Sequence, residues 1–377
     1  MRRVNTAPVN EAESVASALR ARIVAAIRAA GGWLPFERYM ALALYEPGLG
    51  YYANPSRKFG HGPQQGSDFV TAPELTPLFG RTLARQVAQA FDATGTDEVW
   101  EFGAGSGALA LQLIEGLAER GRPPARYRIV DLSGVLRERQ RATLAAHADR
   151  VQWVDALPER FEGVVVGNEV LDAMPVTLLA RVGGQWFERG VALDGERLAW
   201  ADRPTDLRPP IEVPGAHDYL TEIHPQAEAF VRTLADRLAR GAAFLFDYGF
   251  PEAEYYHPQR AMGTLVAHRA HRRDDDVLGD PGEKDITAHV NFTGIALAAQ
   301  DAGLDVIGYT GQGRFLINAG LIDRAREAGV RENALMQKLV NEHEMGELFK
   351  VIALAPRASS AGWVPIGFSA GDRTHRL

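Results

Sequence analysis

From residue 98 onward, short apolar runs alternate with longer segments whose apolar residues recur at helical spacing. Strands that alternate with helices in this way predict parallel crossover connections and a doubly wound α/β sheet of the Rossmann-like kind. Apolar runs that precede or follow helical segments are EVWEF, RYRIVDLS, VQWVDAL, VVVGNEVLDAMP and GAAFLFDYG, and the helical segments are ALALQLIEGLAER, SGVLRERQRATLAAHA and QAEAFVRTLADRLARG.

Other patterns occur outside this alternation. An amphipathic helix is expected around residues 12–30 and another around 77–91, with a Gly-, Pro- and aromatic-rich, loop-like stretch between them. TLLARVGGQWFERGVALDGERLAW alternates apolar and polar residues around Gly-Gly and Asp-Gly turns, which predicts an antiparallel meander. LDVIGYTGQGRFLINAG and LFKVIALAP predict two more strands, with helices over 321–346 between them.

These patterns define the expected organisation of the chain. We expect an N-terminal helix and cap over residues 1–91 and a core over 92–356. The core carries insertions near 177–215 and 251–291, the second of which has no clear periodicity. The last segment, 357–377, is rich in Gly and Ser and is expected to be a frayed tail.

Composition narrows the class of protein. The 377 residues are 46% hydrophobic and carry a net charge of -7, which is typical of a globular protein and argues against general binding of nucleic acid. The absence of cysteine excludes disulfides, thiolate catalysis and Cys-ligated zinc. No apolar run is long enough to cross a membrane, and the acidic residues near the start argue against a transit peptide. We therefore expect a cytoplasmic protein, and the sequence does not indicate its oligomeric state.

The segment from Glu101 to Ala108, EFGAGSGA, connects a predicted strand to a predicted helix. Its glycines permit a tight turn that lies close to a ligand, so Gly103 and Gly105 are candidate cofactor contacts. The same spacing also satisfies the relaxed dinucleotide pattern, with Asp131 as the ribose acid. Glu101 argues against a pyrophosphate, which avoids a neighbouring anion, and fits a ligand with an ammonium and a sulfonium, such as S-adenosylmethionine. A purely structural turn is the alternative.

Further residues at strand ends complete the predicted cofactor site. Asp131, with Leu132 beside it, ends the second strand, where a carboxylate can accept both ribose hydroxyls. Asp155 follows the third strand and can accept from the exocyclic amine of adenine, while Trp153 can stack on the base. Trp153 on an alternating strand is as well explained as a core residue.

Two carboxylates follow the fourth strand, where the edge of the sheet presents polar groups beside the donated methyl. Asn168 is predicted to contact the cofactor, and Glu169 and Asp172 are the predicted catalytic pair. Residues three apart share a face if a helical turn begins here, and two carboxylates suit the planar fork of a guanidinium. Capping of the next turn by Glu169 or Asp172 is the alternative. No His, Asp or Glu cluster has convincing metal-ligand spacing, so no metal is expected.

Taken together, seven segments resemble the MidA-like methyltransferases, a family that includes the mitochondrial complex I assembly factor that methylates an arginine of a partner subunit. The segments are GSDFVTAPELTPLFG, VWEFGAGSGALA, YRIVDLSGVLRERQ, VVGNEVLDAMPV, FLFDYGF, MGTLVAH and EKDITAHVNF. The resemblance spans residues 36–355. It implies S-adenosylmethionine as cofactor and a class I methyltransferase sheet of about seven strands, and it does not fix the substrate. Together with the carboxylate pair Glu169 and Asp172, it favours an arginine of a protein partner as the acceptor. Asp131 stands where relatives often carry Glu, and Asn291 where Asp is common.

The resemblance also suggests roles for residues that the pattern alone does not assign. It implies that the N-terminal segment covers the cofactor, so Thr71 and Glu74 are candidate contacts for its methionine end, although Thr71 and Asp68 also suit turn or cap positions. His289 is either a proton acceptor or a structural histidine. Three functions remain open: a protein-arginine methyltransferase, a small-molecule methyltransferase, or an assembly factor that binds the cofactor without turnover.

Overall fold

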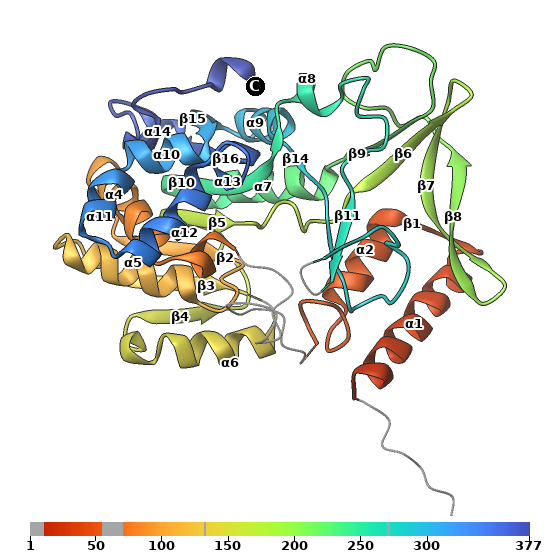
Figure 1. Ribbon diagram of the computed structural model, residues 1–377, viewed down its shortest axis with the longest axis horizontal. Coiled ribbons are helices and arrows are strands. Elements are labelled where there is room, and N and C mark those ends of the chain that lie inside the picture. Colours follow the sequence, from red (N-terminus) through yellow and green to blue (C-terminus); the bar gives the residue numbers. More distant parts are fainter. Residues whose placement is uncertain (1–10, 55–70, 132, 270–271) are drawn as a thin grey trace, which may run out of the picture.

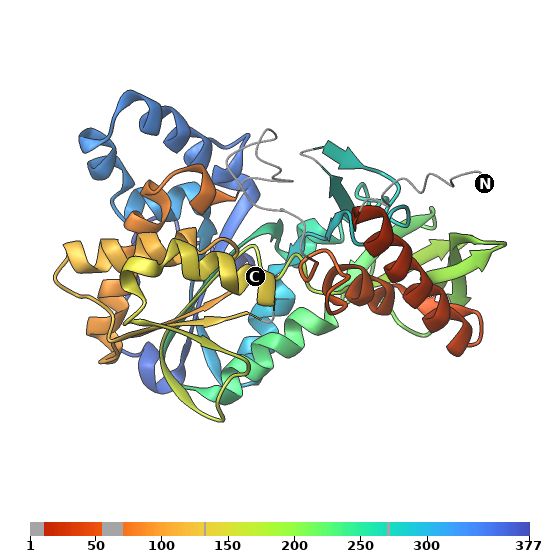
Figure 2. The same cartoon turned by 90° about the horizontal axis from the view of Figure 1, so that it is seen from below.

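The computed structural model describes residues 11–54, 71–131, 133–269 and 272–377, which form two lobes (Figure 1). The larger lobe is an α/β layer structure, and the smaller lobe is an antiparallel sheet with the N-terminal helices packed on it. Figure 2 shows the lobes side by side, with the first helix at the edge of the smaller one.

The sheet at the centre of the larger lobe has eight strands in the described part of the chain, and seven of them lie side by side along one path. In spatial order the strands are β15 (Leu304–Gly311), β16 (Phe349–Pro356), β10 (Leu238–Phe250), β5 (Phe161–Asn168), β2 (Glu98–Phe102), β3 (Arg126–Val130) and β4 (Val151–Val154). The pairs from β10 to β4 are parallel, whereas β16 is antiparallel to β10 and β15. This order confirms the doubly wound, class I methyltransferase sheet.

The strand order reverses between β2 and β5. β3 and β4 lie on one side of this point, and β10, β16 and β15 lie on the other. Loops that leave two neighbouring strands in opposite directions open a crevice at the carboxyl ends of the strands, where α/β proteins bind ligands. The glycine loop follows β2 and Asn168 ends β5, so both predicted site segments meet at this crevice.

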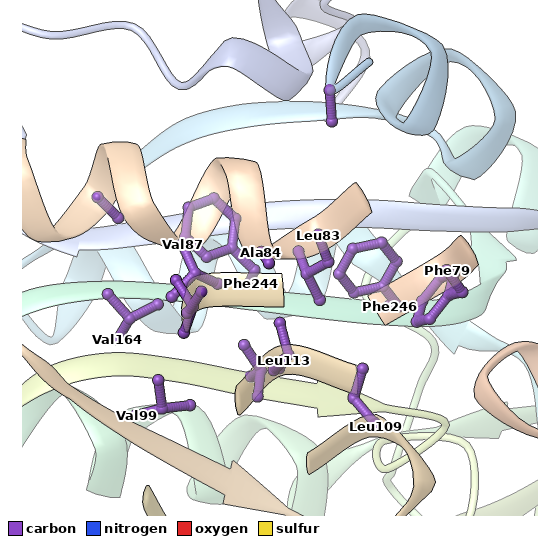
Figure 3. Packing of buried hydrophobic residues seen from close by; sticks show 14 of the residues in the cluster. Phe79, Leu83, Ala84, Val87, Val99, Leu109, Leu113, Val164, Phe244 and Phe246 are labelled. Carbon is purple, nitrogen blue, oxygen red and sulfur yellow. The ribbon is translucent and has the colours of Figure 1, made fainter. Parts of the chain in front are cut away.

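Helices cover both faces of the sheet. On one face lie α4 (Leu78–Thr94), α5 (Ala108–Glu119), α6 (Gly134–Thr143) and α10 (Gln312–Asn318), and on the other lie α7 (Pro225–Arg237) and α9 (Phe292–Asp301). Figure 3 shows Phe79 and Leu83 of α4 packed against Phe246 of β10, with Leu113 of α5 beside them. Each such buried side chain contributes about 1.5–3 kcal/mol, so this packing holds the sheet edge that carries the site.

The smaller lobe is built from the predicted meander. β6 (Thr177–Val182), β7 (Gln185–Asp194) and β8 (Arg197–Pro204) pair antiparallel, and β9 (Tyr219–Ile223) extends the sheet. β1 (Trp33–Pro35) pairs with β7, and α1 (Glu11–Ala29) and α2 (Phe36–Tyr45) pack on the sheet. The loop-like expectation for the segment after α1 was wrong for α2, because Pro and Gly stand at the ends of this helix and apolar residues fill its interior.

The second insertion carries short elements of its own. These are α8 (Glu252–Tyr255) and a sheet of β11 (Val266–Arg269), β12 (Arg272–Asp274) and β13 (Asp285–Thr287). A further strand, β14 (Val290–Asn291), pairs parallel with the end of β10. The hydroxyl of Tyr39 donates to the carbonyl of Val277 at 3.1 Å, and the amide of Asn54 donates to the carbonyl of Gly282 at 3.0 Å. The insertion is therefore fastened to the N-terminal segment.

The C-terminal segment corrects one expectation. After the helices α11 (Leu321–Glu327), α12 (Val330–Val340) and α13 (Met345–Leu348), the chain forms β16 and then α14 (Arg357–Ser360). Residues beyond 360 pack back on the core: Phe368 is 3% exposed, and the backbone N–H of Gly367 donates to Gln86. The tail is thus not frayed, because a buried aromatic residue anchors it. Within the described ranges, no helix combines the length and apolarity needed to cross a bilayer.

Candidate functional site

The glycine loop after β2 has the backbone that its sequence requires. The loop contains three glycines with positive φ values: 63° at Gly103, 53° at Gly105 and 86° at Gly107. Residues other than glycine rarely adopt such values. A Cβ on Gly103 would also lie 3.1 Å from the side chain of Val170 in the turn after β5. The loop therefore turns into α5 while its backbone stays close to the neighbouring turn.

A cavity of about 1170 Å³ lies at the switch point of the sheet. The glycine loop, the end of β3 and the turn after β5 form its core side, and the N-terminal segment and the second insertion close it. Among the residues predicted to contact the cofactor or acceptor, its wall contains Thr71, Glu74, Gly103, Gly105, Asp131, Asn168, Glu169 and Asp172. A cavity of this size accommodates a nucleoside cofactor together with an acceptor side chain.

Asp131 is held in place by its neighbours. Its carboxylate accepts hydrogen bonds from the backbone N–H of Ser133 at 2.8 Å and from the side-chain amide of Gln140 at 2.7 Å. Gln140, which is fully buried, also donates to the carbonyl of Gly105 at 3.1 Å. Burial raises the pKa of Asp131, while these bonds oppose the rise. Gln140 thus connects Asp131, the predicted ribose acid, to the glycine loop, a role that the helical pattern alone did not predict.

Glu101 lies beneath the loop and not on the cavity wall. It is 2% exposed and accepts a hydrogen bond from the hydroxyl of Tyr127 at 2.7 Å. Burial raises the pKa of Glu101 to about 8, and the hydrogen bond from Tyr127 opposes the rise. Its predicted direct contact with the cofactor stays a prediction. In this arrangement, Glu101 also links β2 to β3 below the ligand.

Two predicted contacts come from the N-terminal segment. Thr71 is the N-cap residue of the short helix α3 (Ala72–Leu75), Glu74 lies within this helix, and both line the cavity. The carboxylate of Glu74 accepts a hydrogen bond from the hydroxyl of Ser106 in the glycine loop. The cap and the loop are thereby joined at the predicted methionine end. Asp68 and Leu132 lie outside the described residues.

The structure does not bring the predicted adenine residues to the cavity wall. The indole of Trp153 donates to Gln140 at 2.9 Å and packs on the core. Asp155 forms an ion pair with Arg137 at 2.6 Å, with its side chain 89% exposed. Neither side chain lines the cavity, and their contact with adenine stays a prediction. Val130, Gly134 and Leu136 line this part of the cavity instead.

The turn after β5 holds its carboxylates in a strained backbone. Glu169 has a φ of 55°, which is rare for a residue with a side chain. The buried carboxylate of Asp247 at the end of β10 accepts hydrogen bonds from the backbone N–H groups of Val170, Leu171 and Asp172 at 3.1, 2.8 and 3.2 Å. Asp247 therefore fixes the turn that presents Glu169 and Asp172 to the cavity.

The two predicted catalytic carboxylates lie together. The amide of Asn168 donates to Glu169 at 2.9 Å, and the hydroxyl of Tyr248 donates to Asp172. Burial and then the charge of Asp172 raise the pKa of Glu169 to about 8. Burial raises the pKa of Asp172 to about 6, although the bond from Tyr248 opposes the rise. The pair is thus poised to gain or lose a proton near neutral pH.

Two buried acceptor atoms at this end of the cavity have no hydrogen-bond donor in the part of the chain that the structure describes. They are Oδ1 of Asn168, 9% exposed, and Oδ1 of Asp172, 4% exposed. Buried polar atoms without a partner are costly, so a bound molecule that brings N–H donors would satisfy them. An ammonium and a guanidinium are such donors, and the residues therefore fit the amino-acid end of the cofactor and a cationic acceptor.

Sequence reasoning missed the opposite part of the wall. Tyr45, Tyr52, His268 and Asp285 line the cavity, and they come from the N-terminal segment and the second insertion. Asp285 belongs to the EKDITAHVNF segment, and this was the one signal available in the sequence. His289 does not line the cavity: it packs edge-on against Tyr248 and Phe250, and burial lowers its pKa to about 4. The described residues contain no cluster of potential metal ligands.

A doubly wound sheet with a glycine loop after β2 and carboxylates at the switch point is typical of a nucleoside-dependent transferase of the methyltransferase class. Residues 82–310 match a family described as "Putative S-adenosyl-L-methionine-dependent methyltransferase". The match covers more than half of the chain. The protein therefore belongs to this family of S-adenosylmethionine-dependent methyltransferases, and S-adenosylmethionine is its cofactor.

Solved structures support the same assignment. A protein from Burkholderia thailandensis, crystallised with S-adenosylhomocysteine, is 51% identical with a TM-score of 0.93, over 98% of this chain and 99% of the other. A second crystal structure from that organism is 50% identical with a TM-score of 0.89, over 98% and 99% of the two chains. The fold and the presence of a cofactor site are thus common to close structural neighbours.

More distant relatives are named after an enzyme activity. The mitochondrial protein arginine methyltransferase NDUFAF7 of Homo sapiens is 26% identical over 88% of this chain and 82% of its own. Its homolog in Caenorhabditis elegans is 26% identical over 94% and 91%. These names place the relatives in mitochondria, whereas the cytoplasmic location expected from the sequence stays a prediction for this chain.

The cofactor assignment predicts which substitutions weaken binding. Asp131→Ala is expected to weaken binding of S-adenosylhomocysteine by about 1–3 kcal/mol, the loss of a hydrogen bond to a charged group, and NAD is expected not to bind. Glu101→Ala tests the predicted direct contact of Glu101: a loss of the same size supports the contact, and no loss refutes it. Titration calorimetry measures these affinities, with exposed Asp149→Ala as the control. Asp155→Ala tests the adenine contact: a loss like that of Asp131→Ala supports it, and no loss refutes it. Tight NAD binding contradicts the cofactor site.

Proposed function

We propose that the protein transfers a methyl group from S-adenosylmethionine to an arginine side chain of a protein partner. The observation that carries this proposal is the pair of carboxylates on the cavity wall, half-buried Glu169 and buried Asp172, with acceptor atoms of Asn168 and Asp172 that lack a donor among the described residues. An arginine brings five N–H donors in a planar fork and a permanent positive charge. The names of the distant relatives support the same substrate class.

The residues divide the chemistry in a simple way. Bound S-adenosylmethionine supplies a methyl group on a positively charged sulfur. Glu169 holds the guanidinium so that one nitrogen points at this methyl carbon. Asp172, oriented by Tyr248, attracts the positive charge of the guanidinium to the side that faces its own carboxylate. A carbon–nitrogen bond forms as the carbon–sulfur bond breaks, and Glu169 accepts the proton that the nitrogen loses. A pKa of about 8 for Glu169 suits it to this role.

Two other acceptors fit the cavity less well. A carboxylate acceptor would be repelled by Glu169 and Asp172, and a neutral hydroxyl would gain little from two carboxylates.

The test of the proposed function incubates the enzyme and labelled cofactor with a lysate of cells that lack the enzyme, then separates macromolecules from small molecules. We expect label in protein. Label only in small molecules supports the small-molecule alternative, and no label supports an assembly factor without turnover.

The carboxylates also predict a pH dependence. In the enzyme without bound substrate, Glu169 has a pKa of about 8. Only the deprotonated form of Glu169 can pair with a guanidinium and accept a proton. Because arginine stays charged throughout, kcat/KM is expected to rise with pH by up to about tenfold per unit from pH 6 and to level off above about 8. Initial rates at low acceptor concentration measure this profile. A profile that is flat or that falls over this range contradicts the proton-accepting role.

A further inference from the structure

A second cavity, of about 520 Å³, lies on the larger lobe. Its wall comes from α4, the end of α5 and the start of α11, which are neighbours in Figure 1. In the described part of the chain it shares no lining residue with the cofactor cavity. Because α5 has 12 residues, the second cavity lies about 18 Å along this helix from the glycine loop. We call it the arginine pocket, and its lining residues are Arg85, Glu119, Arg120, Gly320, Asp323 and Arg324.

Both acidic residues of the arginine pocket already face an arginine. Glu119 forms ion pairs with Arg324 at 3.2 Å and with Arg81 at 3.7 Å. Asp323 pairs with Arg326, one turn further along α11, at 3.3 Å. The charges of these two acids are therefore shared with guanidiniums other than those of the two remaining arginines of the wall.

These two arginines, Arg85 and Arg120, form no ion pair and no side-chain hydrogen bond within the described part of the chain. Positive charge is concentrated where they meet. Partial burial and then the charges of Arg324 and Arg85 lower the pKa of Arg120, while Glu119 opposes the shift. Because a guanidinium stays protonated in proteins, these like charges repel one another, and a bound anion would relieve the repulsion.

The backbone of the pocket leaves room for these guanidiniums. A Cβ at Gly320 would lie 2.6 Å from Nη1 of Arg85, so this glycine lets the guanidinium lie against the start of α11. The Nε of Arg324 is buried and has no hydrogen-bond acceptor among the described residues. The pocket therefore holds more N–H donors than the described acceptors satisfy, and an oxyanion would supply the missing acceptors.

We infer that the arginine pocket binds a phosphate group, carried by inorganic phosphate or by a phosphorylated small molecule. The two guanidiniums without an acidic partner match the charge of about −1.5 to −2 that a phosphate monoester carries at pH 7. Their planar N–H forks fit pairs of phosphate oxygens. A carboxylate has a single negative charge and would leave one guanidinium uncompensated. The inference does not depend on the proposed function, because the pocket lies apart from the cofactor cavity.

The test titrates inorganic phosphate into the full-length protein saturated with S-adenosylhomocysteine, by calorimetry at a constant ionic strength of about 0.15 M. We expect saturable binding with a dissociation constant at or below about 1 mM. Acetate should bind at least about 10-fold more weakly, the effect of one lost charge-assisted contact. Glycerol 3-phosphate distinguishes the two sources: tighter binding than that of inorganic phosphate indicates a phosphorylated small molecule, and equal or weaker binding indicates free phosphate.

Variants locate the phosphate on the molecule. Arg85→Gln and Arg120→Gln are each expected to weaken phosphate binding about 10-fold or more, and the double variant to abolish it. Arg122→Gln is the matched control, because Arg122 lies two residues after Arg120, pairs with Asp92 and does not line the pocket. Removal of an unpaired arginine relieves repulsion. Without phosphate, both pocket variants should therefore unfold at the temperature of the wild type or above it, and they should bind S-adenosylhomocysteine as the wild type does.

Three results would overturn the inference. The first is a wild type that shows no saturable phosphate binding below about 10 mM. The second is phosphate binding that Arg85→Gln and Arg120→Gln weaken no more than Arg122→Gln does, since this would place the phosphate outside the arginine pocket. The third is acetate binding as tight as phosphate binding, which would make the pocket a carboxylate site.

Discussion

Glu169→Gln is expected to lower turnover by about 10²–10⁴-fold, the range for a lost general base, while the affinity for S-adenosylhomocysteine stays nearly unchanged. Glutamine keeps the shape of the side chain and can still accept from the amide of Asn168. It cannot carry the negative charge that localises a guanidinium, and it cannot accept the proton that the attacking nitrogen loses. The loss should therefore fall on the chemical step.

Initial rates of label transfer into lysate protein measure this loss, and calorimetry measures cofactor affinity. Glu162→Gln, at an exposed glutamate near the start of β5, is the matched control and should keep full activity. Asp172→Asn should cost less than Glu169→Gln, because Asp172 assists and the hydroxyl of Tyr248 can still donate to the amide oxygen of Asn. Normal turnover by Glu169→Gln would refute the arginine mechanism, although the methyltransferase assignment would stand.

Asp247→Ala is expected to destabilise the protein by about 3 kcal/mol or more and to lower turnover at least about 10²-fold. The substitution leaves the backbone N–H groups of Val170, Leu171 and Asp172 without their acceptor, and each unsatisfied buried group costs about 1–3 kcal/mol. The strained φ of Glu169 depends on this turn, so the catalytic pair loses its position as well.

Asp247→Asn is the matched control. Its amide oxygen can still accept from the three N–H groups of the turn, while the bond from the backbone of Tyr248 is lost. We expect it to recover most of the stability that Asp247→Ala loses. Denaturant unfolding gives the free energies, and turnover is measured well below the unfolding midpoint. If Asp247→Ala is as stable and as active as the wild type, Asp247 does not hold the turn.

The core was predictable because its signals are local. Apolar runs of five to eight residues, each beside a helical pattern, define strands and crossovers within a short span of chain. The glycine loop and the carboxylates after β5 were predictable for the same reason: each follows a strand, and the carboxyl ends of neighbouring parallel strands meet at one edge. Asp131, Asn168, Glu169 and Asp172 accordingly line one cavity, which Thr71, a candidate only through the family resemblance, also lines.

Side-chain partners from distant segments were not predictable. Tyr52 and Asp285 are 233 residues apart and meet only because the insertion packs on the N-terminal segment. Trp153 follows an alternating strand pattern that fits a ligand contact and a core position equally well, and Gln140, thirteen residues earlier, decides its place. The tail was misjudged because its composition indicates flexibility, whereas the burial of Phe368 depends on tertiary contacts.

The central claim is that the protein methylates arginine, and the chemical identity of the labelled residue tests it most directly. Protein labelled from S-adenosylmethionine in the lysate is hydrolysed to amino acids, and the labelled derivative is identified by chromatography and mass spectrometry. We predict methylated arginine as the labelled product, absent when Glu169→Gln replaces the wild type. Label in methyl-lysine or in base-labile methyl esters, with no methylated arginine, would contradict the account.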